Sequence, residues 1–273
     1  MNILRQASFT AIAAVGMTMI IIIGEIDLSA GSLVCAAGLV GAVVCKNTNS
    51  VLLAVLAAIL VGALVGLCNG ILCVCRMSSW FYCYSGKHDI LRGLAYIITG
   101  GNSIVWSNDN FTKIGTGYIG PVPIPVIIMI IAIIFGVMLT TKFRFGRYIY
   151  AVGGNMETSR WSGIPVVKVK ILVYVIMGIL TSIAGLIVTT RLGSGQPSAG
   201  LNFEMDCITA SVVGGTSMSG GRGKVMGTVV GVLLLTVLTN GMTLVGMNTY
   251  WQQVLKGVII VVSVLADTRG KAK

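Results

Sequence analysis

Long apolar runs alternate with short polar segments along almost the whole chain. The runs occupy residues 7–24, 33–45, 51–74, 122–141, 171–190, 225–239 and 251–266, with a shorter run at 207–213. Several reach the length of about 20 residues that a helix needs to cross a bilayer, whereas a membrane β-barrel would show short segments of alternating polarity. The pattern predicts an all-α, polytopic membrane helix bundle with about 8–9 spans, forming one transmembrane domain over residues 1–273.

The composition agrees with a membrane protein. Hydrophobic residues make up 55% of the chain and charged residues 10%, against roughly 25% charged residues in soluble domains. The net charge of +11 lies mostly in loops expected to be cytoplasmic, so it requires no nucleic-acid partner. The cysteines lie in or beside the apolar runs at spacings that fit no zinc site, so we interpret them as small packing residues and expect no bound metal.

The longest polar interruption covers residues 142–170 and sets the expected orientation. It is rich in Lys and Arg and contains a single acid, Glu157. Basic loops between membrane spans mark the cytoplasmic side. We therefore expect this loop and the basic C-terminus on the cytoplasmic side, and residues 102–121 and 191–206 on the opposite side.

A short helix is predicted inside this basic loop. Asn155 is a suitable N-cap, Glu157 lies in the first turn, and Gly163 followed by Pro165 ends the helix. Two interpretations remain open from the residues alone. The helix could be a docking surface for a partner, or the loop could be a solvated connector whose charge only sets the topology.

Two glycine-rich stretches interrupt the apolar runs, GEIDLSAGS at 24–32 and GGTSMSGGRGK at 214–224. Glycine lets the backbone turn or break, and polar groups beside a membrane segment must face water or protein. After each stretch come an Asn-Gly pair, a Trp and a basic residue followed by Gly, which predicts an internal repeat. In transporters, broken segments in duplicated halves point to the substrate path; a purely structural role, letting helices cross closely, is the alternative.

No residue pattern indicates catalysis. The chain has one His, scattered acids and no nucleophile–base pair. GTGYIG at 115–120 is followed by a Pro-rich segment instead of a helix signal. The stretch ending at Lys224 lacks the first glycine and the final Ser/Thr of a phosphate loop. We expect neither an enzyme nor a cofactor bound by this chain.

Several long motifs, in order, resemble the permease subunit of ribose-type sugar ABC importers. They are GMTMIIIIGEIDLSAGS, DILRGLAYIITGG, FGRYIYAVGGNMETSRWSGIPVVKVKILVYVIMG, RLGSGQPSAGLNFEMDCITASVVGGTSMSGGRG and NTYWQQVLKGVIIVVSVL, and they cover nearly the whole chain. The resemblance implies a multi-pass protein of the bacterial inner (plasma) membrane that imports a monosaccharide. It also implies three partners: a second permease copy, in a homodimer or heterodimer, a cytoplasmic ABC ATPase that binds ATP-Mg, and an extracytoplasmic sugar-binding protein.

The resemblance also assigns residue roles. A helix in the family's GxxEAARLSGI-like loop docks on the ATPase, which makes 142–170 the coupling loop. Carried over to this chain, the docking positions are Gly154, Glu157, Thr158, Ser159, Arg160, Ser162 and Gly163. Because neutral sugars need hydrogen-bonding groups, we expect a translocation pathway lined by residues of the two glycine-rich stretches. These are Asp27, Ser29, Ser32, Thr216, Ser217 and Ser219.

The chain departs from the family pattern in two places. The family usually has a further membrane segment before residues 7–24, so we expect this chain to lack the first N-terminal span. Residues 78–88, SSWFYCYSGKH, replace a Pro-rich apolar stretch. Three alternatives therefore stay open: an inactive truncated copy, a permease for branched-chain amino acids or nucleosides, and an ion-coupled secondary transporter with Asp27 as its acid.

Overall fold

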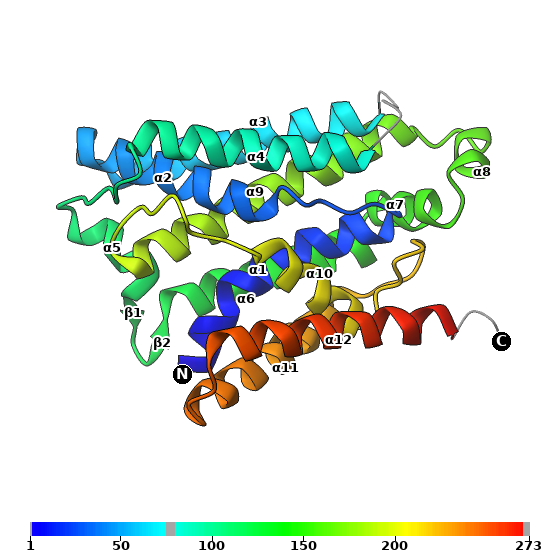
Figure 1. The fold of residues 1–273 in the computed structure, drawn as a ribbon. Coiled ribbons are helices and arrows are strands. Elements are labelled where there is room, and N and C mark those ends of the chain that lie inside the picture. Colours follow the sequence, from blue (N-terminus) through cyan, green and yellow to red (C-terminus); the bar gives the residue numbers. More distant parts are fainter. Residues whose placement is uncertain (1, 75–79, 270–273) are drawn as a thin grey trace.

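The computed structural model is almost entirely helical, as the apolar pattern predicts (Figure 1). It describes the backbone of residues 2–74 and 80–269, and their side chains except those of 80–87 and 264–269. The longer helices are α1 (Asn2–Ile22), α2 (Ala30–Thr48), α3 (Val51–Val74), α4 (Trp80–Thr99), α6 (Ile124–Thr141), α9 (Val166–Leu192), α11 (Val225–Leu244) and α12 (Thr249–Arg269). The shorter elements are α5 (Asp109–Thr116), α7 (Arg144–Gly154), α8 (Met156–Trp161), α10 (Phe203–Val213) and the antiparallel pair β1 (Tyr118–Ile119) and β2 (Val122–Pro123).

Within the described residues, six helices are long and apolar enough to cross a membrane, namely α1, α2, α3, α6, α9 and α11. This confirms the all-α bundle with several candidate membrane spans. Two further helices, α4 with 20 residues and α12 with 21, run along the bundle beside them (Figure 1). The count of 8–9 spans and the internal repeat stay predictions.

Helix α1 forms the centre of the bundle. All its residues from Ala11 to Ile22 are buried, and it packs against α6, α9, α10 and α11. A helix that is apolar on every side can pack against other helices on every side. The polar exception is Thr18, whose hydroxyl bonds to the Ala14 carbonyl at 2.7 Å and to the Thr228 hydroxyl at 2.6 Å. This pair joins α1 to α11.

Helices α3 and α9 approach each other through glycines. A side chain at Gly62 would overlap the Gly178 carbonyl oxygen, and one at Gly66 would overlap the Tyr174 carbonyl oxygen. Gly62 and Gly66 stand at the GxxxG spacing, which permits close packing of a membrane helix, and the structure places both at this contact. Small residues at such contacts let two backbones come together where lipid offers no hydrophobic drive.

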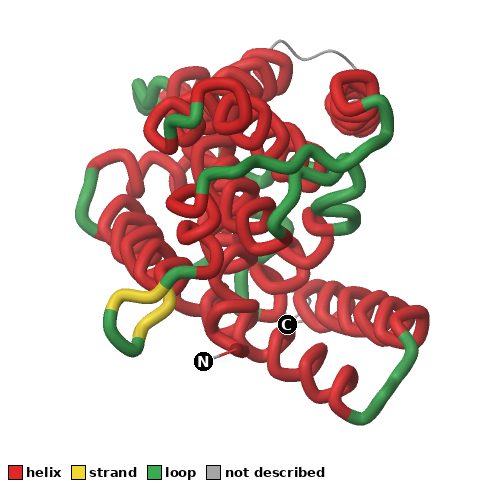
Figure 2. Tube along the Cα trace, turned by 90° about the vertical axis from the view of Figure 1, so that its left-hand side faces the viewer, coloured by secondary structure: helices red, strands yellow, loops and turns green. Residues whose placement is uncertain are grey.

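The connecting segments lie at two opposite ends of the bundle. Helices α7 and α8 and the end of α12 lie at one end, and α5 and the β1–β2 hairpin lie at the other (Figure 1). Viewed from the second end, the hairpin lies at the rim of the bundle (Figure 2). Loops 142–170 and 102–121 are thus at opposite ends, as expected. Which end faces the cytoplasm stays a prediction.

The segment 191–206 differs from the simple loop that its polarity predicted. Helix α9 ends at Gly193, where φ is +70°, and the chain then turns back toward the middle of the bundle, where α10 begins (Figure 1). Glu204 in the first turn of α10 is only 7% exposed. Glu204 and the backbone of this segment therefore pack into protein, whereas Arg191, Ser198 and Asn202 stay exposed.

Candidate functional site

Two segments return to the middle of the bundle and meet there. Residues 23–29 follow α1, and residues 193–202 follow α9 (Figure 1). Each has a glycine in the left-handed region at or next to its first residue, Gly24 with φ +82° and Gly193 with φ +70°. They meet where Gly31, at the start of α2, contacts Gly200: a side chain on either residue would collide with the carbonyl oxygen of the other. We call 23–29 and 193–202 the two re-entrant segments.

The first set of predicted pathway residues lies on the first re-entrant segment and the start of α2. The Asp27 carboxylate accepts hydrogen bonds from the backbone N–H of Ser29 at 2.9 Å and from its hydroxyl at 2.7 Å. Asn69 of α3 donates to the Ser29 hydroxyl oxygen at 2.8 Å, and the Ser32 hydroxyl donates to the Ser29 carbonyl. Asp27, Ser29, Ser32 and Asn69 are all buried. These hydrogen bonds fix the start of α2 against α3.

The second set lies elsewhere, in the loop 214–224 that joins α10 to α11. Thr216 and Ser217 are buried, whereas Ser219 is exposed. Gly221 donates its backbone N–H to the carbonyl of Ile22 at 2.8 Å, which ties this loop to the end of α1. The two sets were expected to line one pathway. That stays a prediction: the first set bonds to α3, the loop of the second set bonds to the end of α1, and the two stretches touch where Gly220 lies against Gly24.

Loop 214–224 also contacts α7. The Tyr150 hydroxyl donates to the Gly223 carbonyl at 2.8 Å, and a side chain at Gly220 would overlap the Gly153 carbonyl oxygen. Burial raises the pKa of the Tyr150 phenol, so this group stays a hydrogen-bond donor at neutral pH. The C-terminal end of α7 is thereby held against the loop and, through Ile22, against the end of α1.

Helix α8 is the short helix that the sequence predicted in the basic loop. The Asn155 side chain accepts a hydrogen bond from the Thr158 N–H at 2.9 Å, so the N-cap is confirmed. Gly163 has φ +79°, which confirms it as the stop. Of the docking positions expected in this loop, only Ser159 is buried, while Gly154, Glu157, Thr158, Arg160, Ser162 and Gly163 are exposed. Trp161 is 89% exposed, so this turn presents both charge and a large apolar ring.

Glu25 forms a junction that sequence reasoning did not single out. Its carboxylate pairs with the Lys170 ammonium and accepts from the Tyr174 hydroxyl at 2.7 Å, both on α9. The Cys73 thiol of α3 donates to the same carboxylate, so Cys73 is not simply a packing residue. The side chains of Lys170 and Glu25 are 12% and 17% exposed. Glu25 thus ties the first re-entrant segment to two helices.

A pocket of about 110 Å³ adjoins this junction and reaches the basic loop. It is lined by Cys73 and Val74 of α3, Met156 and Arg160 of α8, and Val166, Val167 and Lys170 of α9. Residues of α8 and the Glu25 partners Lys170 and Cys73 therefore line the same pocket. The sequence shows that Glu25 is an acid beside a membrane segment, and such an acid needs a partner. It does not show which of several basic residues is that partner.

Arg92 of α4 holds the second re-entrant segment. Its Nη1 donates to the carbonyl oxygens of Pro197 at 2.9 Å and Ala199 at 2.6 Å. Arg92 is only 8% exposed. A buried cation in a membrane bundle is costly unless it has polar partners. The carbonyl groups of the second re-entrant segment are these partners.

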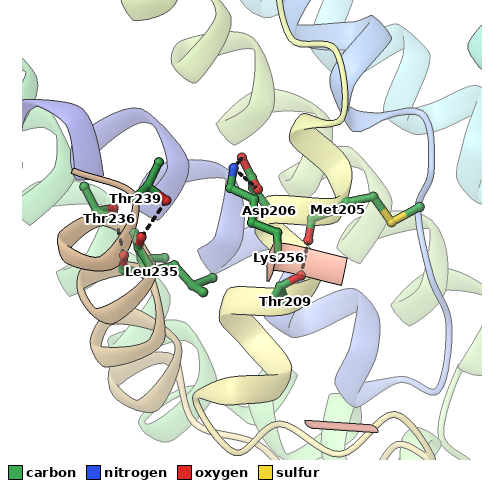
Figure 3. Close-up of polar contacts among 8 residues, drawn as sticks. Met205, Asp206, Thr209, Leu235, Thr236, Thr239 and Lys256 are labelled. Carbon is green, nitrogen blue, oxygen red and sulfur yellow. Dashed lines mark hydrogen bonds and ion pairs between the residues drawn. The ribbon is translucent and has the colours of Figure 1, made fainter. Parts of the chain in front are cut away.

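A second charged pair lies between α10 and α12. Lys256 reaches both carboxylate oxygens of Asp206, at 2.8 and 3.0 Å (Figure 3). Its side chains are 30% and 35% exposed. The pair borders a pocket of about 80 Å³ that also includes Gln6 of α1 and Thr236 and Thr239 of α11. Thr236 and Thr239 bond to carbonyls of their own helix.

The architecture defines the class of protein. Apolar helices surround buried polar groups at two re-entrant segments, and broken membrane segments of this kind are typical of transporter folds. The protein is a polytopic membrane transport component. It belongs to the family described as branched-chain amino acid transport system / permease component, which matches residues 1–264.

Individual relatives are similar along almost their whole length. The chain is 41% identical over 271 residues to the ribose import permease protein of Haemophilus influenzae, with 98% of this chain and 84% of that protein covered. Identity to the ribose import permease protein of Bacillus subtilis is 39% over 275 residues, covering 100% and 85%. The xylose transport system permease protein of Haemophilus influenzae is 32% identical over 334 residues, covering 100% and 89%. No solved structure matches the chain.

Proposed function

We propose that this chain is the transmembrane permease subunit of an ATP-driven ABC importer for a monosaccharide, located in the bacterial cell membrane. The observation that carries the proposal is the 41% identity to a ribose import permease over 98% of the chain. Ribose and xylose permeases both appear among the relatives, so a pentose is the first substrate to test. The importer includes a second permease copy, an ATPase that supplies ATP hydrolysis, and an extracytoplasmic sugar-binding protein.

Coupling to the ATPase occurs through loop 142–170, with α8 as the docking helix. Three features support this role: the capped start at Asn155, the glycine stop at Gly163 and the exposed Trp161 between them. A docking helix needs a fixed shape and exposed contact groups, and large aromatic side chains are typical anchors of interfaces. Glu157 and Arg160 provide the charges of the contact.

Movement of α8 reaches the re-entrant segments by two routes. One runs through α7, whose Gly153 and Tyr150 contact loop 214–224. The other runs through Lys170 at the start of α9, which pairs with Glu25. In this proposal the residues expected along the translocation pathway shape the path beside the solute, and loop 214–224 also lies on the coupling route. The pathway residues are Asp27, Ser29, Ser32, Thr216, Ser217 and Ser219.

The helix order supports the internal repeat and a count of eight spans. The six candidate spans together with α4 and α12 make eight. Helices α1–α4 and α9–α12 form the two halves, which run in opposite directions through the bundle (Figure 1). Both contain Ser-Ala-Gly in their re-entrant region, at 29–31 and 198–200. The repeat therefore aligns GEIDLSAGS with 193–202, not with 214–224.

Uptake measurements test the function. Cells without their own pentose importers would express the chain with its ATPase and binding protein and receive labelled ribose, xylose, leucine or adenosine. We expect uptake of a pentose that depends on ATP. The alternative is a permease for branched-chain amino acids, which the family description names, or for nucleosides. Uptake of leucine or adenosine without uptake of either pentose would establish it.

A further inference from the structure

Arg92 and Glu204 bring opposite charges to the place where the two re-entrant segments meet. Arg92 comes from α4 and bonds to the carbonyls of Pro197 and Ala199. Glu204 comes from the first turn of α10, and its Oε2 lies against Gly31 at the start of α2. Burial raises the pKa of the Glu204 carboxyl, and the charge of Arg92 opposes this rise. The two side chains are 8% and 7% exposed.

Both side chains keep buried polar atoms that the described part of the chain leaves without a hydrogen bond. These atoms are Nε and Nη2 of Arg92 and Oε2 of Glu204. Arg92 uses Nη1 to hold the re-entrant carbonyls, so the edge of the guanidinium formed by Nε and Nη2 is unused. Buried polar groups are nearly always hydrogen-bonded in folded proteins. The guanidinium with the unused donors bonds next to Gly200, at Ala199, and the unused acceptor lies at Gly31, which contacts Gly200, so a partner is missing at this contact.

The missing partner must accept from the guanidinium edge and donate to the carboxylate. A hydroxyl group does both, because it carries one donor hydrogen and two acceptor lone pairs. Two adjacent hydroxyls match the two N–H groups on one edge of arginine, while one of them donates to Glu204. The formal charges of Arg92 and Glu204 cancel, which suits a neutral ligand.

We propose that Arg92 and Glu204 form a binding site for a vicinal diol of the transported monosaccharide, at the contact between the re-entrant segments. This inference rests on the proposed function and adds the residues that recognise the sugar. Because Arg92 also holds residues 193–202 in place, binding of the diol and the position of this segment are linked. A shift of the segment therefore alters the site and releases the sugar.

The test measures sugar binding by the permease without the binding protein, which has its own specificity. The purified permease in detergent would be titrated with ribose, 2-deoxyribose and leucine, and binding would be read from the rise in unfolding temperature. We expect stabilisation by ribose, with 2-deoxyribose at least tenfold weaker because it lacks one hydroxyl of a diol. Arg92→Lys, which keeps the charge and loses the forked edge, and Glu204→Gln should each weaken ribose binding at least tenfold.

The control is Asp109→Asn, which removes an exposed carboxylate at the start of α5 and should leave ribose binding unchanged. If Arg92→Lys does not fold, ribose binding by Glu204→Gln alone tests the site, because the amide keeps the shape of the carboxylate. Unchanged ribose binding in Glu204→Gln would overturn the site, and so would an absence of ribose binding in a permease whose complete importer takes up ribose. Binding of leucine instead would overturn the sugar assignment. Failure of the complete importer to take up any pentose would overturn the proposed function itself.

Discussion

Gly31 and Gly200 contact each other through their backbones alone: a side chain on either would overlap the carbonyl oxygen of the other. The two residues are the last of the Ser-Ala-Gly sequences at 29–31 and 198–200. Gly200 also has φ +71°, which few residues other than glycine adopt. This contact in the middle of the bundle thus requires glycine at both positions.

A methyl group at Gly31 should therefore disturb the bundle. We expect Gly31→Ala to lower the free energy of unfolding by about 1–3 kcal/mol, the usual cost of an overpacked interior, and to reduce uptake. Gly241→Ala on α11 is the matched control, because nothing lies within 4 Å of a side chain there. Thermal unfolding in detergent would compare the two. Equal midpoints would show that the backbones can separate without cost.

The docking role of α8 predicts a loss of coupling without a loss of insertion. Glu157→Lys reverses a charge of the contact, and Gly163→Val places a β-branched residue at φ +79°. Both should abolish substrate-stimulated ATP hydrolysis in the reconstituted complex, while the amount of protein in the membrane stays the same. Gly120→Val is the control, since Gly120 has φ +60° at the opposite end of the bundle. Normal stimulated hydrolysis in both α8 variants would make the loop a connector only.

The pair formed by Glu25 and Lys170 should matter for both stability and transport. Removing one partner of a largely buried pair costs about 3 kcal/mol or more, because the other charge is left alone. We expect Glu25→Gln and Lys170→Met each to slow uptake, and the double variant to be less impaired than the sum of the two. A double-mutant cycle on uptake rates and unfolding free energies measures this. Strict additivity would mean that the two charges act independently.

Tyr150 should make the free energy of unfolding depend on pH in the alkaline range. Burial raises the pKa of its phenol in the folded protein. The contribution of Tyr150 to stability is therefore complete below the pKa of tyrosine in the unfolded chain, about 10. It is lost as the pH rises through the pKa of Tyr150 in the folded protein. Tyr150→Phe should lower the unfolding free energy by about 1 kcal/mol at neutral pH, the worth of a typical hydrogen bond. The difference from the unmodified protein should shrink above pH 10 or so. Tyr250→Phe, at an exposed site, should show neither effect.

The orientation of the bundle can be tested by labelling single cysteines. Ser162→Cys and Ser107→Cys place exposed thiols at the two ends, in a background without reactive native cysteines. An impermeant reagent applied to intact cells should label position 107 and leave position 162 unlabelled until the membrane is opened. Labelling of both positions in intact cells would contradict the assignment of the basic loop to the cytoplasm.

The sequence predicted those features that local rules control. The helical class follows from the length of the apolar runs, and α8 follows from an Asn cap and a Gly stop. The close approach of α3 to α9 follows from small residues at Gly62 and Gly66. Each of these signals lies within a few residues of the feature it predicts.

The remaining features depend on partners far along the chain. Residues 193–202 have the composition of a loop, and they turn inward because Arg92 supplies donors to carbonyls more than a hundred positions away. Similarly, the two polar stretches look alike in sequence, yet one bonds to Asn69 and the other to Ile22. Composition identified both stretches as unusual but could not say which helix each would meet.

The central position of α1 has a consequence for how the protein is made. Thr18 leaves the ribosome early, but its partner Thr228 lies 210 residues later, which at about 5–20 residues per second is a delay on the order of 10–40 s. During that interval α1 must wait in the bilayer with lipid against surfaces that the finished bundle encloses. A pause in synthesis before α11 would prolong this exposure. The synthesis of α11 therefore sets the time at which α1 is enclosed and protected from proteolysis.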